Sequence, residues 1–295
     1  MIDRAQVLKD LQPDRDFFIG IDSDGCAFDT MEIKHKECFC PTTIKYFALQ
    51  SVSKYAREAW EFVNLYSKKR GVNRFPALVA VLDLLRARRA VQDRRAEIAG
   101  LDSLRRWMGA ETRLGNPALR RLVEASGDEE LAHVLAWSEA VNTAVADLVR
   151  GVPPFPYLTD SLDRARTKAD MMVVSSTPLE ALEREWAEHD LARYVRVIAG
   201  QEHGSKQEHL TYAAAGKYPK EKTLMIGDAY GDLKAALSVE ALFYPILPGR
   251  EEASWQRFFE EGLERFFAGT YAGAYQEALM KELDDALPET PPWER

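Results

Sequence analysis

A short apolar run that ends in two aspartates constrains this chain more than any other feature. Residues 17–30 have the sequence FFIGIDSDGCAFDT, in which Asp22, Asp24 and Gly25 follow the apolar residues 17–21 at once. A brief apolar run bounded by a turn residue predicts a buried strand of a parallel sheet. Ligands of open parallel sheets bind beyond the carboxyl ends of the strands. Both carboxylates are therefore expected at the mouth of such a crevice.

Two carboxylates at one strand end are costly unless a cation joins them. Mg²⁺ prefers oxygen ligands and is usually held by one or two carboxylates together with substrate phosphate. With the charge neutralised, one carboxylate can attack phosphorus while its neighbour transfers a proton. Asp22 and Asp24 are therefore candidate catalytic residues, with Mg²⁺ as the expected cofactor. Taken alone, D-x-D-G could also be a plain turn after a strand.

A second apolar run, residues 171–174, ends in hydroxyl side chains. Ser175 and Ser176 follow it directly, and Thr177 is expected to cap the next helix, with Glu180 completing a capping box. The amides and dipole at a helix N-terminus just beyond a strand end form a suitable site for phosphate. Ser175 and Ser176 are the candidate phosphate-binding residues here.

Two later segments add a lysine and two further acids. Lys206 opens a predicted helix over residues 207–216 and could neutralise a phosphoryl group as a point charge. Residues 223–226 form another apolar run, and Gly227, Asp228 and Asp232 follow it. Gly227 would let the backbone approach closely while Asp228 reaches a metal ion.

In order and spacing, these four segments resemble the four motifs of the haloacid dehalogenase (HAD) superfamily. DSDGC resembles the first motif, in which Thr is commoner than the Cys26 found here; Ser175, Lys206 and G-D-x-x-x-D at 227–232 resemble the other three. The resemblance implies Mg²⁺ bound by the Asp22 carboxylate, the Asp24 backbone carbonyl and Asp228. It also implies that Asp232 assists through water or by orienting Lys206.

The resemblance further implies a mechanism. Asp22 would attack the phosphoryl group and form an aspartyl-phosphate, while Asp24 would protonate the leaving oxygen and then activate water. Ser175, the Ser176 amide and Lys206 would hold the phosphoryl oxygens. Family members that act on haloalkanoates or phosphonates lack the second carboxylate, so Asp24 favours hydrolysis of a small phosphorylated metabolite, with a phosphomutase as the alternative.

The sequence predicts a three-layer α/β fold with a Rossmann-like parallel sheet and an inserted helical domain. Between residues 42 and 150 the apolar residues recur at helical spacing without a strand pattern, and G-V-P-P-F-P at 151–156 predicts the returning linker. We expect residues 1–33 and 152–295 to form the core and residues 34–151 to form an all-helical cap. Residues up to Pro41 are expected as a connector, and residues 287–295 as a frayed tail.

Charge limits the range of partners. The net charge of −8 argues against a generally nucleic-acid-binding or membrane-surface protein. Residues 86–121 nevertheless hold ten arginines against four acids, so this segment carries +6 and the remainder −14. One or two of these cap arginines could clamp an anionic substrate. The rival hypothesis is a non-catalytic protein whose arginine-rich cap docks an acidic partner or RNA.

Cysteine content and the N-terminus predict a cytoplasmic location. Three cysteines are few and odd in number, which is typical of reduced thiols, and His35, Cys38 and Cys40 lack the second ligand pair of a zinc finger. The first sixteen residues carry charges throughout and do not resemble a signal peptide. No apolar run reaches the length of a membrane span. The sequence does not predict the oligomeric state.

Overall fold

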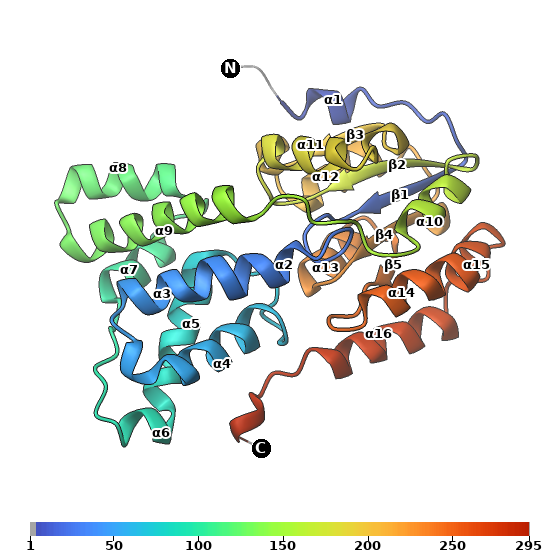
Figure 1. Cartoon of the computed structure of the whole chain (residues 1–295). Coiled ribbons are helices and arrows are strands. Elements are labelled where there is room, and N and C mark those ends of the chain that lie inside the picture. Colours follow the sequence, from blue (N-terminus) through green and yellow to red (C-terminus); the bar gives the residue numbers. More distant parts are fainter. Residues whose placement is uncertain (1–3, 295) are drawn as a thin grey trace. The chain divides into compact units, whose positions relative to one another are not determined.

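The computed structural model describes residues 4–294 and contains a five-stranded parallel sheet (Figure 1). The strands lie in the order β3-β2-β1-β4-β5, with bounds β1 Phe17–Ile21, β2 Ala169–Val174, β3 Val197–Ala199, β4 Thr223–Gly227 and β5 Leu242–Pro245. Ile21 lies opposite Val173 of β2 and Ile226 of β4. The chain therefore leaves these three strands at one edge of the sheet. The predicted α/β class with a parallel sheet is confirmed.

Helices pack on both faces of the sheet, because successive strand residues point to opposite sides. Ile19 and Ile21 pack into a core shared with α10 (Leu158–Ala165), α11 (Leu179–Glu188), α14 (Glu251–Arg257) and α15 (Leu263–Phe267). Phe18 packs on the other face with α1 (Gln6–Lys9), α12 (Lys206–Ala213) and α13 (Tyr230–Ser238). The sheet thus forms the middle of three layers.

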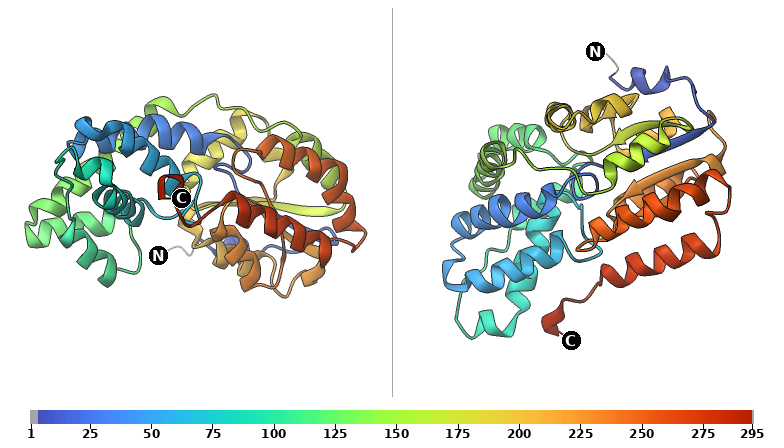
Figure 2. Two further views of the ribbon diagram at one scale, coloured as in Figure 1. Left: turned by 90° about the horizontal axis from the view of Figure 1, so that it is seen from below. Right: turned by 45° about the vertical axis from the view of Figure 1, so that its right-hand side comes forward.

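A further helix, α16 (Ala274–Ala286), protects the edge strand β5. The Phe243 N–H donates to the Gln276 side-chain oxygen (3.1 Å), and the Tyr271 hydroxyl donates to the Phe243 carbonyl (2.8 Å). These bonds satisfy backbone groups that an open sheet edge leaves unpaired. Arg257 and Glu282 form a two-point ion pair at 2.9 and 3.1 Å, which joins α16 to α14; Figure 2 shows these helices side by side. The sequence pattern did not predict α16.

Among the described residues, the second compact unit comprises 32–150 and 288–294. A π-helical segment, Lys34–Phe39, precedes α3 (Cys40–Tyr46), α4 (Ser53–Asn64), α5 (Arg74–Ala87), α6 (Arg89–Gln92), α7 (Asp102–Ala110), α8 (Asn116–Ser126) and α9 (Glu129–Leu148). Trp60 and Trp137 lie fully buried among Phe39 and Phe75 at its centre. This unit has its own aromatic core, and its described residues form no strand of the sheet.

The expected connector up to Pro41 is helical instead. Helix α2 (Thr30–Ile33) runs into the π-helical segment and then into α3, where Pro41 occupies the first turn. The Cys40 N–H donates to the carbonyl of His35, five residues back. Proline lacks an N–H and is tolerated at the start of a helix, so the wider π turn allows the helical path to continue through Pro41.

The tail beyond Leu287 is ordered, contrary to the expectation. The Trp293 ring lies 5.7 Å from that of Phe62, and the Arg88 guanidinium lies 4.4 Å from the centre of the Trp293 ring. Indole packing against an aromatic ring and a cation stabilises this placement. Residues 288–294 therefore pack with the helical unit, although we had assigned them to the sheet unit. Among residues 4–294, no helix is both long and apolar enough to cross a membrane.

Candidate functional site

The end of β1 places Asp22 among buried backbone. The Asp22 N–H donates to the Ile226 carbonyl (3.0 Å), which extends the pairing with β4 by one residue. Ser23 points to other partners: its hydroxyl donates to Glu185 (2.9 Å) and accepts from the Trp186 indole N–H (3.0 Å). Both partners lie on α11, so they fix the loop between the two aspartates. The sequence pattern does not indicate this anchor.

The start of α12 positions Lys206. Ser205 and Glu208 form a capping box, in which the Ser205 hydroxyl accepts from the Glu208 N–H (3.3 Å) and the Glu208 carboxylate accepts from the Ser205 N–H (2.8 Å). The box fixes Lys206 as the first helical residue. Its ammonium contacts Asp22 Oδ2 at 2.8 Å and Asp232 Oδ1 at 2.6 Å. Side chains from three separate segments thus meet at one edge of the sheet.

The G-D-x-x-x-D segment brings two further carboxylates to this edge. Oxygen atoms of Asp22, Asp228 and Asp232 all lie within 4.8 Å of one another, and all three residues are buried. Gly227 makes this possible, because a β-carbon added there would lie 2.3 Å from the Asp232 β-carbon. The Ala229 N–H donates to Asp232 Oδ2 (3.2 Å) and orients that carboxylate. Only glycine lets the first turn of α13 approach β4 so closely.

The electrostatics of this cluster favour a bound divalent cation. Burial and the neighbouring acids Asp232 and Asp228 raise the pKa of Asp22, although Lys206 opposes the shift. Burial alone would lower the pKa of Lys206, but contacts with Asp22 and Asp232 raise it, so this ammonium stays protonated. Three ionised carboxylates and one ammonium carry a formal charge of −2. One divalent cation would balance that charge, and oxygen donors are the ligands that Mg²⁺ prefers.

Asp24 lies outside the acid cluster and is held by two hydroxyl groups. Thr177 donates to Asp24 Oδ2 (2.6 Å), and Thr30 donates to Asp24 Oδ1. The expected Thr177 helix cap is therefore wrong: α11 has no side-chain cap, and its Leu179 N–H donates to Glu202 (2.9 Å). A hydroxyl bonded to a carboxylate forms a stronger, charge-assisted bond than a neutral cap. Sequence spacing gave no signal for the role of Thr30.

Ser175 follows β2 and lies buried next to the end of β3. Its N–H donates to the Ala199 carbonyl (3.0 Å), and its hydroxyl accepts from the Thr177 N–H (3.2 Å). Among residues 4–294 the Ser175 hydroxyl donates to no acceptor, so its proton can be donated to a bound oxygen. Ser176 is exposed. Ile21 of β1 pairs with Val173 of β2, two residues before Ser175. Ser175 therefore lies level with the loop that follows Asp22.

Cys26 packs beneath the site. Its sulfur lies 3.7 Å from the Ile226 carbonyl, and the Trp255 indole N–H donates to the Cys26 carbonyl (2.7 Å). Burial and the nearby acids raise the pKa of this thiol well above its usual value, so it stays neutral. Cys26 thus contributes packing and adds no charge to the cluster.

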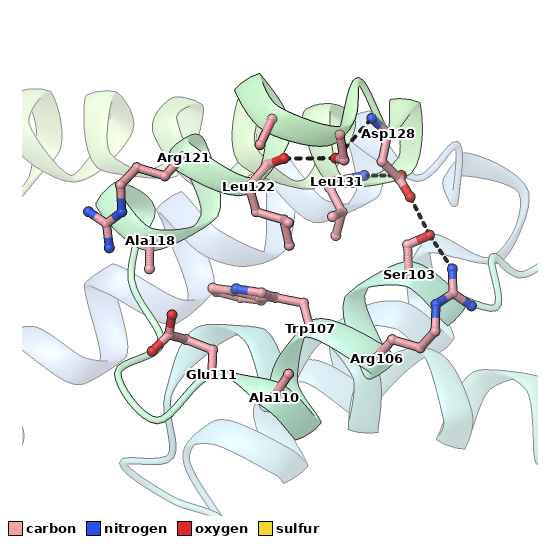
Figure 3. Close-up of a pocket in the computed structure, with 12 residues that line it drawn as sticks. Ser103, Arg106, Trp107, Ala110, Glu111, Ala118, Arg121, Leu122, Asp128 and Leu131 are labelled. Atoms are coloured by element: carbon pink, nitrogen blue, oxygen red, sulfur yellow. Dashed lines mark hydrogen bonds between the residues drawn. The ribbon is translucent and has the colours of Figure 1, made fainter.

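An open cavity of about 610 Å³ lies within the helical unit and contains none of these residues. Figure 3 shows Trp107 at its centre, with Arg121 and Glu111 toward one end and Arg106 and Asp128 toward the other. Arginine and acid therefore alternate around the opening. The cavity does not present a surface of one charge sign.

Comparisons with known proteins give structural similarity only. No protein-family profile and no curated protein matches the chain. Similar solved structures include a HAD-superfamily hydrolase of subfamily IA from Geobacter sulfurreducens, 14 % identical, with a TM-score of 0.37 over 80 % of this chain and 89 % of that one. A haloacid dehalogenase-like hydrolase from Streptococcus pneumoniae is 12 % identical, with a TM-score of 0.43 over 81 % and 90 %.

A third similar structure is a predicted phosphatase from Clostridium acetobutylicum, 15 % identical, with a TM-score of 0.40 over 78 % of this chain and 83 % of that one. Identities this low do not decide an activity.

Proposed function

We propose that this chain is a Mg²⁺-dependent phosphate monoester hydrolase of the HAD superfamily that forms an aspartyl-phosphate on a small phosphorylated metabolite. One observation carries the proposal: Lys206 and the carboxylates of Asp22, Asp228 and Asp232 meet, buried, at the carboxyl edge of a parallel sheet. Sheets of this kind bind their ligands at that edge. A cluster of acids with one lysine suits a cation and an anion bound side by side.

Mg²⁺ would be held by the carboxylates of Asp22 and Asp228 and by the backbone carbonyl of Asp24. Asp232 would orient Lys206 beside the ion. When bound, the ion would neutralise charge on the phosphoryl oxygens. The acid cluster fits this role because its three carboxylates offer only oxygen ligands. Together with the Lys206 ammonium, their formal charges sum to −2.

Asp22 acts as the nucleophile in this proposal. Lys206 lies 2.8 Å from Asp22 Oδ2 and can contact both the nucleophile and an oxygen of the incoming phosphoryl group. Ser175 donates its hydroxyl proton to a second phosphoryl oxygen. Attack by Asp22 Oδ on phosphorus forms the aspartyl-phosphate and breaks the bond to the leaving oxygen. Water then attacks phosphorus and releases inorganic phosphate and free Asp22.

Asp24 moves the protons in both steps: it gives one to the leaving oxygen and takes one from the attacking water. Hydrogen bonds from Thr177 and Thr30 support this role, since they fix the rotamer of the carboxylate. We propose that the helical unit is the family's inserted cap and selects the substrate. A small metabolite is the substrate class that a capped site of this kind takes.

A phosphomonoester panel with and without EDTA tests the proposal. We expect phosphate release from p-nitrophenyl phosphate and from at least one phosphometabolite in Mg²⁺, and none in EDTA. Asp22→Asn should abolish release without loss of helical circular dichroism. Conversion of a sugar phosphate to its isomer without net phosphate release would favour the phosphomutase alternative. Binding of Mg²⁺ without turnover of any panel member would contradict the hydrolase.

Mg²⁺ binding gives a readout that is independent of turnover. A ligand that binds only the folded state stabilises it by about 2.7 kcal/mol at one hundred times its dissociation constant. We expect this stabilisation in the wild-type protein and its loss in Asp228→Asn. Lys234→Met, which alters an exposed residue of α13, serves as the control.

A further inference from the structure

The turn between β2 and α11 carries Thr177 and has little support from its own residues. Thr177 and Leu179 flank Pro178, whose ring fixes its φ angle at −55°. Helix α11 has no side-chain cap at the position before its first residue, and Ser176 and Pro178 are both exposed. The position of this turn therefore depends on contacts from elsewhere in the sheet unit.

The segment that follows β3 supplies those contacts on both sides of Pro178. The Gln201 N–H donates to the Thr177 carbonyl (3.0 Å), and Glu202 Oε2 accepts from the Leu179 N–H (2.9 Å). The second bond is charge-assisted, and it places a carboxylate at the start of α11, where the helix dipole favours an acid. Glu202 therefore holds the turn more firmly than a neutral acceptor would.

Gly200 allows these two bonds to form. A β-carbon added at Gly200 would lie 2.8 Å from both the Leu179 nitrogen and the Thr177 carbonyl oxygen. The buried His203 ring in turn accepts from the Gly200 N–H at Nδ1 (3.2 Å), which fixes the segment itself. The segment and the turn are thus in direct backbone contact, so a shift of one displaces the other.

The same turn orients the carboxylate to which proton transfer is assigned. Thr177 donates to Asp24 Oδ2 at 2.6 Å, while Thr30 donates to Asp24 Oδ1. Because Pro178 is stiff, a displacement at Leu179 is transmitted to Thr177. Without the Thr177 bond, Asp24 would be held by one hydroxyl only and could rotate away from the leaving oxygen.

We propose that Glu202 is a positioning residue for proton transfer by Asp24. It acts by holding the Leu179 N–H, and through Pro178 it keeps the Thr177 hydroxyl on Asp24. The inference rests on the proposed function, in which Asp24 protonates the leaving oxygen. Glu202 acts through Thr177 and not on the substrate.

Two esters of nearly equal shape test this role. Phenolate is a poorer leaving group than p-nitrophenolate, so phenyl phosphate depends more on protonation by Asp24 than p-nitrophenyl phosphate does. We expect Glu202→Ala to lower kcat/KM by at least about 10-fold for phenyl phosphate and by less than about 3-fold for p-nitrophenyl phosphate. A smaller amount of correctly folded protein would lower both values equally. Equal losses for the two esters would therefore overturn the proposal.

Control variants separate this contact from a general effect of charge. Glu180→Ala removes the same charge from an exposed residue in the first turn of α11, and both esters should be hydrolysed as by the wild-type protein. Glu202→Gln keeps an oxygen acceptor for the Leu179 N–H and should recover most of the activity on phenyl phosphate. A Glu202→Gln protein as impaired as Glu202→Ala would contradict the hydrogen-bond role.

A double mutant tests whether Glu202 acts through Thr177. In the Thr177→Val background, Glu202→Ala should lower activity on phenyl phosphate by less than about 2-fold more, because both changes remove the same bond to Asp24. Losses that multiply in full would show that the two residues act independently and would overturn the proposal.

Crystal structures give a readout that does not need turnover. We expect the Thr177 hydroxyl to leave hydrogen-bond distance of Asp24 in Glu202→Ala and to stay at about its present 2.6 Å in Glu180→Ala. If Glu202→Ala does not fold, Gly200→Ala displaces the same turn from the other side and should show the same loss. An unchanged bond overturns the proposal. If no ester is hydrolysed the proposed function fails, while the structures still decide whether Glu202 positions Thr177.

Discussion

Removal of the Lys206 charge should destabilise the sheet unit strongly when Mg²⁺ is absent. The ammonium lies 2.8 Å from Asp22 and 2.6 Å from Asp232, whose side chains are 6 % and 0 % exposed. Lys206→Met keeps most of the packing of the side chain and leaves both carboxylates without this counter-ion. Loss of one partner of a buried ion pair costs about 3–5 kcal/mol. Proton uptake by one carboxylate limits the cost, so we expect about 3 kcal/mol.

Urea unfolding in EDTA measures this loss. The sheet unit and the helical unit can unfold in separate transitions, so a single unfolding curve does not isolate the sheet unit. Hydrogen exchange of peptides from β1 and β4 reports the stability of the sheet unit alone. Lys234→Met is the control: it removes a charge from the exposed surface of α13 and should change stability by less than about 0.5 kcal/mol. Mutating Asp232 to Asn in the Lys206→Met background should recover part of the loss. A Lys206→Met protein as stable as the control would refute the buried-pair argument.

Three further substitutions test other contacts. In Gly227→Ala the new β-carbon would lie 2.3 Å from that of Asp232. We expect a loss of about 1–3 kcal/mol in urea unfolding and weaker Mg²⁺ binding in calorimetry. Full Mg²⁺ affinity would contradict the close approach. Thr177→Val should lower kcat by about 10-fold with little change in KM, because the Thr177 hydroxyl orients Asp24. Thr177→Ser keeps the hydroxyl and should restore kcat. A change in KM alone would argue against a positioning role. Asp170→Asn should cost about 1.5–3 kcal/mol at pH 7, and this cost should shrink as pH falls through the folded-state pKa of Asp170.

The pH window for Asp170 follows from its contacts. Burial by itself raises its pKa, but hydrogen bonds from the Asp14 and Arg15 amides, Tyr218 and Arg196 outweigh burial and hold the pKa below its usual value. A depressed pKa in the folded state gives stability above the unfolded value of about 3.9, and this stability is lost as pH falls through the folded value. Urea midpoints of the wild-type protein and Asp170→Asn, compared across pH, measure it. A difference that did not shrink toward acidic pH would contradict the assignment.

The sheet could be predicted from the sequence because its strands are short and almost continuously apolar. Residues 18–21 and 223–226 are buried on both faces of the sheet, and nearly all of them are apolar. The strand ends then placed Asp22 and Asp228 at one edge, since parallel strands end on the same side. Lys206 was predicted from its resemblance to a motif lysine at the start of a helix, and the structure places it as the first residue of α12.

Features set by distant contacts were not predicted. Thr177 lies 153 residues from Asp24, and its sequence context favours a helix cap as much as a carboxylate partner. Trp293 seemed to belong to a polar tail, and only the fold brings it to Arg88. Local sequence determines local turns, while the choice between competing partners depends on the tertiary fold.

Covalent trapping on Asp22 tests the central claim most directly. The protein is mixed with a substrate from the panel in Mg²⁺, quenched in acid within one turnover and digested, and the peptide that contains residues 17–30 is examined by mass spectrometry. We predict a peptide heavier by one phosphoryl group, with the group located on Asp22, and no such peptide in EDTA. Turnover by a protein that never carries phosphate on Asp22, or one that carries it on another residue, would contradict the account.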